Sequence, residues 1–538
     1  MSDGLRDFLI GLLAALAGSK GWLNEKLNAL LINKMALQGR TRPHPWSTRD
    51  DYISWSGLTD RHFNARLLPA DHAFTADLPP TTAVAALFNA PVSGQRPSAK
   101  STCLFPAFAQ YLTDGFIRTQ LSNVDALEDR RRTTSNHEID QSPLYGRTEA
   151  QTRALRKLSE AVGERGRLKS QSFHGEEFSP FLYDAAGVIN PEFLDANGVP
   201  ILDEPLGVTK PFANKPSLFA VGGDRVNAAP QVAMMNTLFL REHNRLAGVI
   251  EARHPGWNDE RVFQTTRNIS IVMFIKLVVE EYINHINTMP FKLRALPNVA
   301  WGAKWNRPNW MTAEFSLLYR WHSLIPKEMT WNGTPINGTA LLLNNKPLLD
   351  HGLANAFADI SGNVATELGL GNSADFLFRA ELKAVEQART NNITAYNAYR
   401  KAMKLKPAKS FTEIVGTSKD PATQARLTAL ATALAAQYGT VDKLEFYIGI
   451  FAEPCSRNGP LPELLTAMVA MDAFSQAMTN PLLSLHIWGD EANRLATFTA
   501  EGLAAIEATP NLRTVLERNS SGLGTRFVGM TQEGWKRR

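Results

Sequence analysis

Hydrophobic residues recur every three to four positions along most of this 538-residue chain. That period places them on one side of an α-helix. No stretch alternates between apolar and polar residues strongly enough to predict a sheet, and no internal repeat is present. The pattern therefore predicts one large, mainly helical unit. Its clearest helices cover residues 232–253, 258–287, 350–368, 376–405, 422–438, 441–453, 461–478 and 492–507.

Local signals mark where several of these helices begin and end. Pro255 and Gly256 stop the first one, and Asn258 is a suitable cap for the next. A further helix is expected from about residue 103, with Pro106 in its first turn. Residues 40–100 and 165–230 are rich in loop-forming residues. We expect residues 1–40 to form an N-terminal appendage and residues 41–538 one catalytic domain.

The first forty residues are unusually apolar. Residues 8–18 form a short apolar run, and a second segment carries its apolar residues largely on one helical side, at Trp22, Leu23, Leu27, Leu30, Leu31 and Met35. The favoured interpretation is a pair of amphipathic helices that lie on a membrane without crossing it, since no apolar run reaches the ~20 residues of a spanning helix. Ordinary core helices and a signal peptide remain the alternatives, although the leading residues are not basic.

Composition narrows the range of partners and compartments. The net charge is +5 and the pI is about 9.0, with both signs of charge mixed along the chain. No aromatic and basic stripe typical of nucleic-acid binding is present, whereas an anionic membrane surface would attract the protein weakly. Cys103 and Cys455 are the two cysteines, too few for a disulfide framework or a multi-cysteine metal site. We therefore expect a cytoplasmic, peripheral membrane protein.

A tyrosine three residues before a histidine carries the most specific chemistry. Tyr319 and His322 lie in the segment that runs from Glu314 to His322, and one helical turn would project both from the same side. If His322 binds a haem iron, Tyr319 is close enough to be oxidised to a radical. A histidine beside a tryptophan is more often a packed core residue, so the surrounding sequence has to decide.

The surrounding motifs resemble the animal haem peroxidase and cyclooxygenase superfamily. Thr237–Leu246 is similar to a helix shared by its members, and the likeness extends from about residue 20 to about residue 527. Further matching segments are Asp51–Trp55, Arg66–Pro69, His254–Trp257, Glu280–Tyr282, Tyr399–Lys401 and Leu444–Tyr447. The resemblance implies a large, mainly α haem peroxidase fold like that of a bacterial-type cyclooxygenase or a linoleate diol synthase.

The resemblance also assigns the residues on the proximal side of the haem. His322 matches the proximal iron ligand, and Tyr319 matches the tyrosine that becomes a radical in the fatty-acid oxygenases. The string from Tyr319 to His322 is especially similar to the fungal linoleate diol synthases. Halide-oxidising peroxidases lack a tyrosine at this offset, so the resemblance favours a lipid oxygenase.

On the distal side, the chain departs from the family. Gln110 matches a glutamine that lies over the iron, but Asp114 occupies the position of the family's acid–base histidine. Arg225 aligns with a distal arginine, and we expect its charge to depress the Asp114 pKa. Asp114 either performs the acid–base step with peroxide or disables it, and both alternatives remain open.

Other family features fail to carry over. Thr113 and Ala228 stand where some relatives have the carboxylates that bond covalently to haem, so a non-covalent heme b is expected. Asn136, Asp140 and Ser142 match part of a calcium loop, but a partner aspartate is replaced by Gly115. Calcium prefers six to eight oxygen ligands, so no bound calcium is expected.

Lys34 is the candidate anchor for a substrate carboxylate. It falls near the cyclooxygenase arginine that binds the fatty-acid head group, whereas Met289 replaces the tyrosine at the same channel mouth. A cation at the mouth of an apolar channel suits a fatty acid. The alternative is an ordinary surface lysine.

These features together predict a haem-dependent fatty-acid dioxygenase. A radical on Tyr319 would take a hydrogen atom from an unsaturated acyl chain before O2 adds, with a hydroperoxide as the activating oxidant. One alternative is a haem peroxidase that oxidises small organic reductants. Another is a haem-binding protein with weak activity, because Asp114 replaces the distal histidine. The oligomeric state stays open, a homodimer included.

Overall fold

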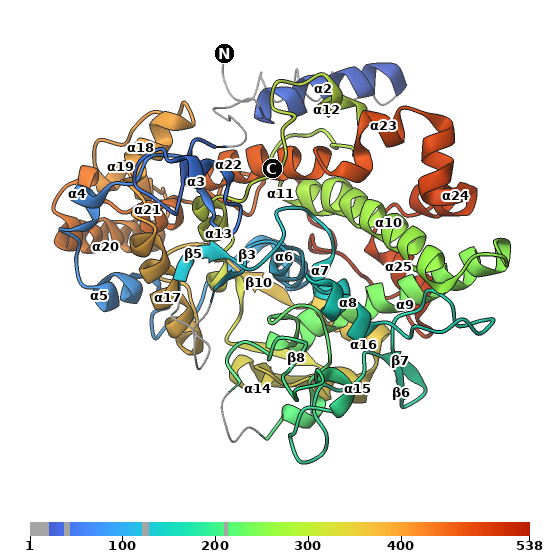
Figure 1. Cartoon of the computed structure of the whole chain (residues 1–538). Coiled ribbons are helices and arrows are strands. Elements are labelled where there is room, and N and C mark those ends of the chain that lie inside the picture. Colours follow the sequence, from blue (N-terminus) through green and yellow to red (C-terminus); the bar gives the residue numbers. More distant parts are fainter. Residues whose placement is uncertain (1–20, 37–43, 121–128, 209–212, 538) are drawn as a thin grey trace.

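The computed structural model describes residues 21–36, 44–120, 129–208 and 213–537. Helices form most of the described chain, so the prediction of a mainly α fold is confirmed. Figure 1 shows α6 (Leu104–Asp114) near the middle of the molecule, with α9 (Pro230–Arg253) and α10 (Asp259–Leu277) beside it. Helix α9 packs against both α6 and α10, and these three helices form the centre of the fold.

The remaining helices surround this centre. Those before α9 are α2 (Gly21–Ala36), α3 (Trp55–Thr59), α4 (His72–Thr75), α5 (Thr81–Ala85), α7 (Ser142–Tyr145) and α8 (Glu149–Leu155). Those that follow α10 in the middle of the chain are α11 (Asn284–Ile286), α12 (Asn298–Trp301), α13 (Ala313–Leu318), α14 (Gly338–Leu341), α15 (Lys346–His351) and α16 (Leu353–Gly362). The last group is α17 (Phe378–Thr390), α18 (Tyr396–Ala402), α19 (Phe411–Val415), α20 (Pro421–Tyr438), α21 (Phe446–Ala452), α22 (Glu463–Met478), α23 (Leu485–Trp488), α24 (Glu491–Glu507) and α25 (Leu512–Asn519).

The strands of the described chain form five small antiparallel pairs. They are β1 (Trp46–Ser47) with β2 (Ala65–Arg66), β3 (Pro97–Thr102) with β10 (Val364–Thr366), β4 (Thr119–Gln120) with β5 (Asp129–Thr133), β6 (Gln171–Phe173) with β7 (Glu176–Phe178), and β8 (Glu328–Trp331) with β9 (Thr334–Asn337). The longest register is that of β8 and β9, where Glu328 pairs with Asn337 and Trp331 with Thr334. None of these pairs extends into a larger sheet.

Helix α9 and the start of α10 lie where the sequence indicates. Pro230 occupies the first turn of α9, and the chain leaves the helix at His254. The Asn258 side chain accepts from the backbone N–H of Arg261 at 2.9 Å, which caps α10. The predicted helix over residues 258–287 is interrupted, since the π-helical turn η5 (Val278–Ile283) separates α10 from α11.

The longest helical run is also apolar enough to span a membrane. Residues 259–286 contain an 18-residue window that meets this test by length and hydropathy, contrary to the expectation that no such window exists. However, 78% of the window is buried inside the protein. Aromatic contacts fill this interior, among them those of Phe108 with Phe274 and of Phe108 with Tyr282. The run therefore packs as a core helix.

Helix α2 is the described part of the predicted N-terminal appendage, and residues 1–20 lie outside the described residues. One side of α2 packs on α12 and α22, with Asn28 and Ile32 fully buried. Its Asn33 side chain accepts from Trp305 Nε1 at 2.8 Å. Trp22 and Leu30 remain 59% and 61% exposed, so apolar residues occupy the outer side of α2 as well.

Helix α13 ends before Tyr319, contrary to the prediction that Tyr319 and His322 share one helix. Tyr319 is the residue that follows the helix, and Trp321 has φ −90° and ψ 42°, outside the helical region. His322 then begins the short 3-10 helix η6 (His322–Leu324). At the break, the rings of Tyr319 and Trp321 stack on each other, and Trp321 also packs against Phe105 of α6, a contact from a distant segment.

Candidate haem site

The imidazole of His322 lies beside the carboxylate of Glu381, a residue from a later segment of the chain. Its Nδ1 lies 3.2 Å from Oε2 of Glu381, an ion-pair distance without the geometry of a hydrogen bond. Glu381 comes from α17 and its side chain is fully buried. A carboxylate at Nδ1 fixes the orientation of an imidazole and leaves Nε2 for a metal.

Two hydroxyl groups hold Glu381 in place. Ser373 donates to Oε1 at 2.7 Å, and Tyr447 of α21 donates to Oε2 at 2.8 Å. Burial and the neighbouring Glu381 carboxylate raise the pKa of Tyr447 well above its ordinary value, so this phenol keeps its proton. The Glu381 charge is thus supported by donors although it is out of contact with water.

Tyr319 lies in a column of aromatic rings beside the histidine. Its ring centroid is 4.8 Å from that of Trp321, with an interplanar angle of 24°, and 4.8 Å from that of Phe315. Trp321 in turn packs against Phe105 of α6, with 5.2 Å between centroids. The segment that carries Tyr319 and His322 therefore lies directly against α6.

The π-helical turn η5 brings a second tyrosine to this column. The ring of Tyr282 lies 6.5 Å from that of Trp321, and its phenol lies close enough to Tyr319 to affect the Tyr319 pKa, although the Tyr282 oxygen has no partner in hydrogen-bond geometry. Burial raises the pKa of both phenols, and Asp472 of α22 raises that of Tyr319 further. Both tyrosines therefore keep their O–H groups at neutral pH.

Gln110 is the accessible residue of the helix that faces this segment. The other ten of the eleven residues of α6 are buried, and Gln110 alone keeps partial exposure. His322 likewise keeps 21% exposure, whereas its neighbours Trp321 and Ser323 are buried. The donor set fits haem, since a single half-buried imidazole with a carboxylate behind it can hold the axial position of a porphyrin iron. Gln110 is the polar residue available on the α6 side.

Asp114 and Arg225 meet, as the sequence predicted. Arg225 Nη1 lies 3.5 Å from Asp114 Oδ1, and the backbone N–H of Arg225 donates to Oδ2 at 3.3 Å. However, the expected fall of the Asp114 pKa is wrong. Burial, followed by the nearby carboxylate of Asp224, raises it to about 7, and these two effects outweigh Arg118 and Arg225.

Asp114 is therefore part of a buried charge cluster and not an isolated acid. Arg118 Nη2 lies 3.1 Å from Asp224 Oδ2 and 2.8 Å from Asp203 Oδ2, and Arg147 also pairs with Asp203. Gly223 allows the close packing, because a Cβ there would stand 2.1 Å from Asp114 Oδ2. Side chains from separate parts of the chain thus set the charge of Asp114.

Arg320 links the proximal and distal charges. It donates to Oε1 of Gln387 at 2.9 Å, and it lies between Tyr319 and His322 in sequence. Burial, followed by the positive charge of Arg225, lowers the pKa of Arg320 to about 9. The guanidinium groups of Arg320 and Arg225 are thus close enough to repel each other.

The polar groups of the partial calcium loop form hydrogen bonds with one another. Asn136 donates to Asp140 Oδ2 at 2.6 Å, and the backbone N–H of Ser142 donates to Oδ1 at 2.8 Å. Among the described residues, no group of three or more His, Cys, Asp or Glu side chains could hold a metal ion. Thr113, at one of the positions where relatives carry an ester-forming carboxylate, donates to the carbonyl of Ala109 at 2.9 Å. Ala228, at the other, has no side-chain oxygen.

Lys34 lies exposed on α2. Helix α2 packs on α22, and α22 packs on α13, the helix that ends at Leu318, directly before Tyr319. Helix α22 therefore lies between the helix that carries Lys34 and the helix that precedes Tyr319, and it packs against both. Its role as an anchor stays a prediction.

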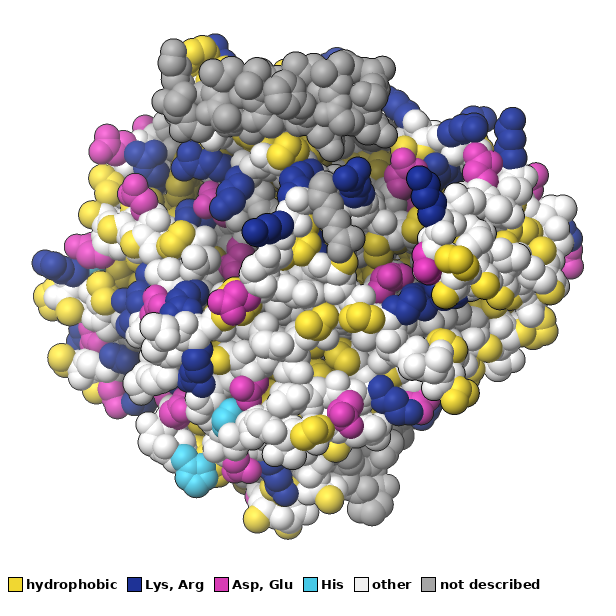
Figure 2. Space-filling model, turned by 180° about the vertical axis from the view of Figure 1, so that it is seen from behind, with side chains coloured by type: hydrophobic (Ala, Val, Ile, Leu, Met, Phe, Trp, Pro, Cys, Tyr) yellow, Lys and Arg dark blue, Asp and Glu magenta, His cyan; other side chains and the backbone are white. Residues whose placement is uncertain are grey.

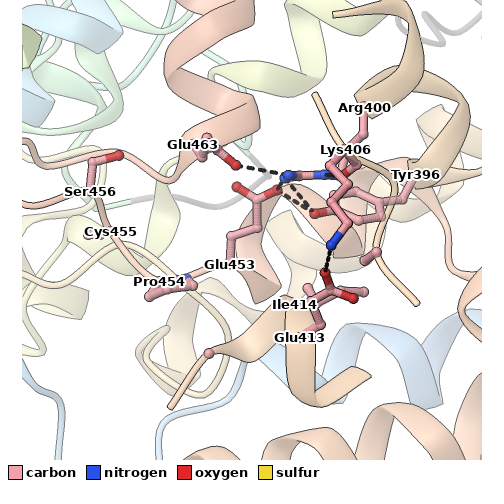
Figure 3. A pocket seen from close by; sticks show the side chains of 12 residues that line it. Tyr396, Arg400, Lys406, Glu413, Ile414, Glu453, Pro454, Cys455, Ser456 and Glu463 are labelled. Carbon is pink, nitrogen blue, oxygen red and sulfur yellow. Dashed lines mark hydrogen bonds and ion pairs between the residues drawn. The ribbon is translucent and has the colours of Figure 1, made fainter. Parts of the chain in front are cut away.

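A surface cavity of about 340 Å³ contains none of the predicted site residues. Figure 3 shows Arg400 in this cavity pointing toward Glu453 and Glu463, with distances of 2.7 Å and 2.9 Å. Tyr396 donates to Glu453 as well, and Lys406 pairs with Glu413. Because these ion pairs join α18 to the start of α22, the cluster stabilises the fold around the site.

A helical body that presents one carboxylate-backed imidazole beside a buried tyrosine defines a haem oxidoreductase. The sequence pattern described as "Animal haem peroxidase" matches residues 106–528, and the chain belongs to this family. It binds haem, as the family does.

Individual relatives agree with this assignment. The chain is 27% identical to prostaglandin G/H synthase 2 of Bos taurus over 493 residues, covering 89% of this chain and 74% of the synthase. Its fold is similar to peroxidase A from Dictyostelium discoideum, with a TM-score of 0.67, 18% identity, and coverage of 91% and 99%. It is also similar to the fatty acid alpha-dioxygenase of Oryza sativa, with a TM-score of 0.67, 16% identity, and coverage of 98% and 96%.

Sequence reasoning missed three residues that contact the predicted ones. Glu381 faces His322, Tyr282 contacts Tyr319, and Asp224 contacts the same arginine as Asp114. Tyr282 lies in a segment that matched the family, and Asp224 directly precedes Arg225, so their positions offered a signal. Glu381 had none, because a single glutamate in an amphipathic helix is typical of a solvent-exposed position.

Proposed function

We propose that this protein is a haem-dependent dioxygenase of unsaturated fatty acids that uses a radical on Tyr319. The observation that carries the proposal is the partly buried phenol of Tyr319, which stacks on Trp321 and lies three residues before the haem-binding candidate His322. Relatives named as prostaglandin synthases and a fold shared with a fatty acid alpha-dioxygenase support it. The cofactor is proposed to be a non-covalent heme b.

The chain's own residues have distinct roles in this proposal. His322 would hold the iron and Glu381 would orient the imidazole. When bound, haem supplies the one-electron oxidising power that a hydroperoxide delivers. Gln110 and Arg225 offer hydrogen bonds to peroxide oxygens, and Asp114 is the group that supplies a proton to the leaving oxygen.

Tyr319 then acts on the substrate. Loss of its phenolic hydrogen gives a neutral radical, since the raised pKa keeps the O–H group intact beforehand. That radical takes a hydrogen atom from the acyl chain, which restores the phenol, and O2 adds to the carbon radical. The resulting peroxyl radical takes the phenolic hydrogen atom of Tyr319, which gives a lipid hydroperoxide and regenerates the tyrosyl radical.

Tyr319→Phe tests this proposal. Phenylalanine keeps the ring and its stacking on Trp321 and removes only the abstractable hydrogen. Oxygen uptake with linoleate should fall to background, while haem absorbance and peroxide-driven oxidation of a small phenol stay nearly unchanged. Tyr282→Phe is the matched control, because it removes the neighbouring hydroxyl and leaves the abstractor in place.

The opposite result would identify the alternative enzyme. If Tyr319→Phe leaves fatty-acid oxygenation intact, the radical mechanism is wrong. If the wild type oxidises small phenols and takes up no oxygen with any fatty acid, the protein is a peroxidase that acts on small reductants. Absence of both activities in the haem-loaded protein would point to a haem-binding protein without turnover.

We further propose that the protein is cytoplasmic and lies on a membrane surface through α2 without crossing it. Trp22 and Leu30 are exposed on α2, and Lys26 lies 5.2 Å from the Trp22 ring. Figure 2 shows several Lys and Arg side chains on the upper half of one side of the molecule, a charge that suits anionic lipid. Trp22→Glu with Leu30→Glu should reduce binding to anionic vesicles and leave haem absorbance unchanged. Equal vesicle binding by both proteins would refute a role for α2.

A further inference from the structure

Asp224 and Asp114 approach each other on one arginine. Nη1 of Arg225 is 3.4 Å from Asp224 Oδ1 and 3.5 Å from Asp114 Oδ1. Both carboxyl groups are buried, with side-chain exposures of 7% and 0%. Two carboxyl groups at one nitrogen atom in the protein interior repel each other if both are ionised.

The hydrogen bonds of Asp114 leave one oxygen unsatisfied. Its Oδ2 accepts from the backbone N–H of Arg225, but its buried Oδ1 has no hydrogen-bond donor. A buried carboxylate oxygen without a donor is destabilising. A proton between Asp114 and Asp224 removes that problem, because a protonated carboxyl donates to its ionised neighbour.

The surrounding charges favour Asp224 as the ionised member. Asp224 has two cations, since Arg118 lies 3.1 Å from its Oδ2 in addition to Arg225. Within 4 Å, Asp114 has Arg225, which it shares with Asp224, whereas Arg118 acts on Asp114 from farther away. Other charged or titratable groups that face the cluster are Asp203, which pairs with Arg118 and Arg147, Arg320, which acts on Arg225, and Tyr111 of α6.

We propose that Asp114 and Asp224 hold one proton between them and that Asp224 is the positioning residue that keeps Asp114 in its acid form. The consequence for catalysis rests on the proposed function, since peroxide cleavage needs a group that can give a proton to the leaving oxygen. Asp114 would then start as the acid, whereas a histidine at this position would start as the base. The raised pKa of Asp114 agrees with this arrangement.

Infrared spectroscopy of the haem-loaded protein tests the shared proton without any turnover. The spectrum of wild type minus that of Asp114→Asn should show a protonated-carboxyl stretch at about pH 5, and this Asp114 band should disappear by about pH 8. In Asp224→Asn the same band should disappear at least about one pH unit lower, because Arg225 and Arg118 then act on Asp114 alone.

Glu281→Gln is the matched control. Glu281 is a buried carboxyl with a pKa of about 7 that accepts from the backbone of Leu512.

Glu281→Gln should lose its own band and leave that of Asp114 at its wild-type pH. A second readout is the dependence of kcat on pH for the oxidation of a phenol by peroxide. The part of this profile that follows the titration of Asp114 should move about one pH unit lower in Asp224→Asn, while KM stays unchanged. Asp224→Glu keeps a carboxyl group and should move it less. A purely structural role of Asp224 would lower kcat at every pH alike.

Two results would overturn the proposal. One is a wild-type spectrum without any band that depends on Asp114. This outcome can be read without any Asp224 variant, so it does not depend on whether such a variant folds. The other is an Asp114 band that titrates at the same pH with and without Asp224. If the bands behave as expected but no fatty acid is oxygenated, the shared proton stands and the proposed dioxygenase function fails.

Discussion

The proximal and distal sides of the candidate haem site are built in different ways. On the proximal side, each predicted residue has its own close partner, Glu381 for His322 and Tyr282 for Tyr319. On the distal side, Asp114 belongs to a cluster of arginines and carboxylates that share partners. Two of its arginines each pair with two carboxylates, and the third pairs with a carboxylate that another arginine also binds. Removing one proximal residue should therefore remove one function, whereas a distal change should redistribute charge over several groups.

The difference explains why the two sides respond differently to burial. Glu381 is buried beside an imidazole, and two hydroxyl groups donate to its oxygens. Asp114 is buried next to a second carboxyl group, so its pKa rises although an arginine lies at 3.5 Å. A nearby opposite charge does not by itself fix the sign of a pKa shift.

The largest effect is expected from His322→Ala on the proximal side. Without the imidazole, haem should be retained at less than about a tenth of the wild-type level, because the iron loses its axial ligand. Absorbance at the Soret band, relative to protein concentration, measures this. His351→Ala is the control, since His351 also lies beside a carboxylate, Asp359, at 2.9 Å. Full haem content in His322→Ala would show that another residue binds the iron.

Glu381→Gln should have the next largest effect. It keeps the shape of the side chain and removes the charge behind His322, so peroxide-driven phenol oxidation should fall about 10- to 100-fold. Haem content should be reduced far less than in His322→Ala. Tyr447→Phe removes one donor to Glu381 and should fall between Glu381→Gln and wild type. Equal rates in all three proteins would contradict a proximal role for Glu381.

On the distal side, Asp114→Asn should change the pH dependence of stability. The folded-state pKa of about 7 exceeds the ordinary value of 3.8, so the folded protein binds this proton more tightly than the unfolded chain. The stability from Asp114 is then complete below about pH 4 and is lost as pH rises to about 7. Relative to Asp114→Asn, wild type should lose about 1.4 kcal/mol per pH unit in that window.

Denaturant unfolding of both proteins across that pH range measures this difference. A constant difference at all pH values would mean that Asp114 is ionised throughout. The same variants report on catalysis, since Asp114→Asn should slow oxidation of a small phenol by peroxide at neutral pH. Asp114→His should speed it, because a neutral imidazole can accept the first proton.

The smallest effect is expected from Gly223→Ala. The added methyl group would stand 2.1 Å from Asp114 Oδ2, so the carboxyl must move away from Asp224 and Arg225. Crowding of this kind costs about 1–3 kcal/mol of unfolding free energy. Gly302→Ala is the control, because nothing lies within 4 Å of its Cβ position. Equal unfolding free energies of the two variants would show that the Asp114 carboxyl can move to make room for the methyl group without loss of stability.

Helix positions were largely predictable, because their signals are local. Caps, prolines and apolar spacing act within a few residues, and α9, α20, α22 and α24 lie within one or two residues of their predicted bounds. The break after Leu318 was not predictable in this way. It depends on Trp321, which packs against Tyr319 and against Phe105 of another helix.

The sequence by itself determined the helical body, the family, and the choice of His322, Tyr319, Gln110, Asp114 and Arg225 as candidates. Only the tertiary structure decided that Glu381 faces the imidazole, that Tyr282 contacts Tyr319, and that Asp224 joins Asp114. The physical reason is that a residue type and its spacing define which chemistry is available. The protonation state and orientation of that residue depend on burial and on charges brought from distant segments, which no local pattern contains.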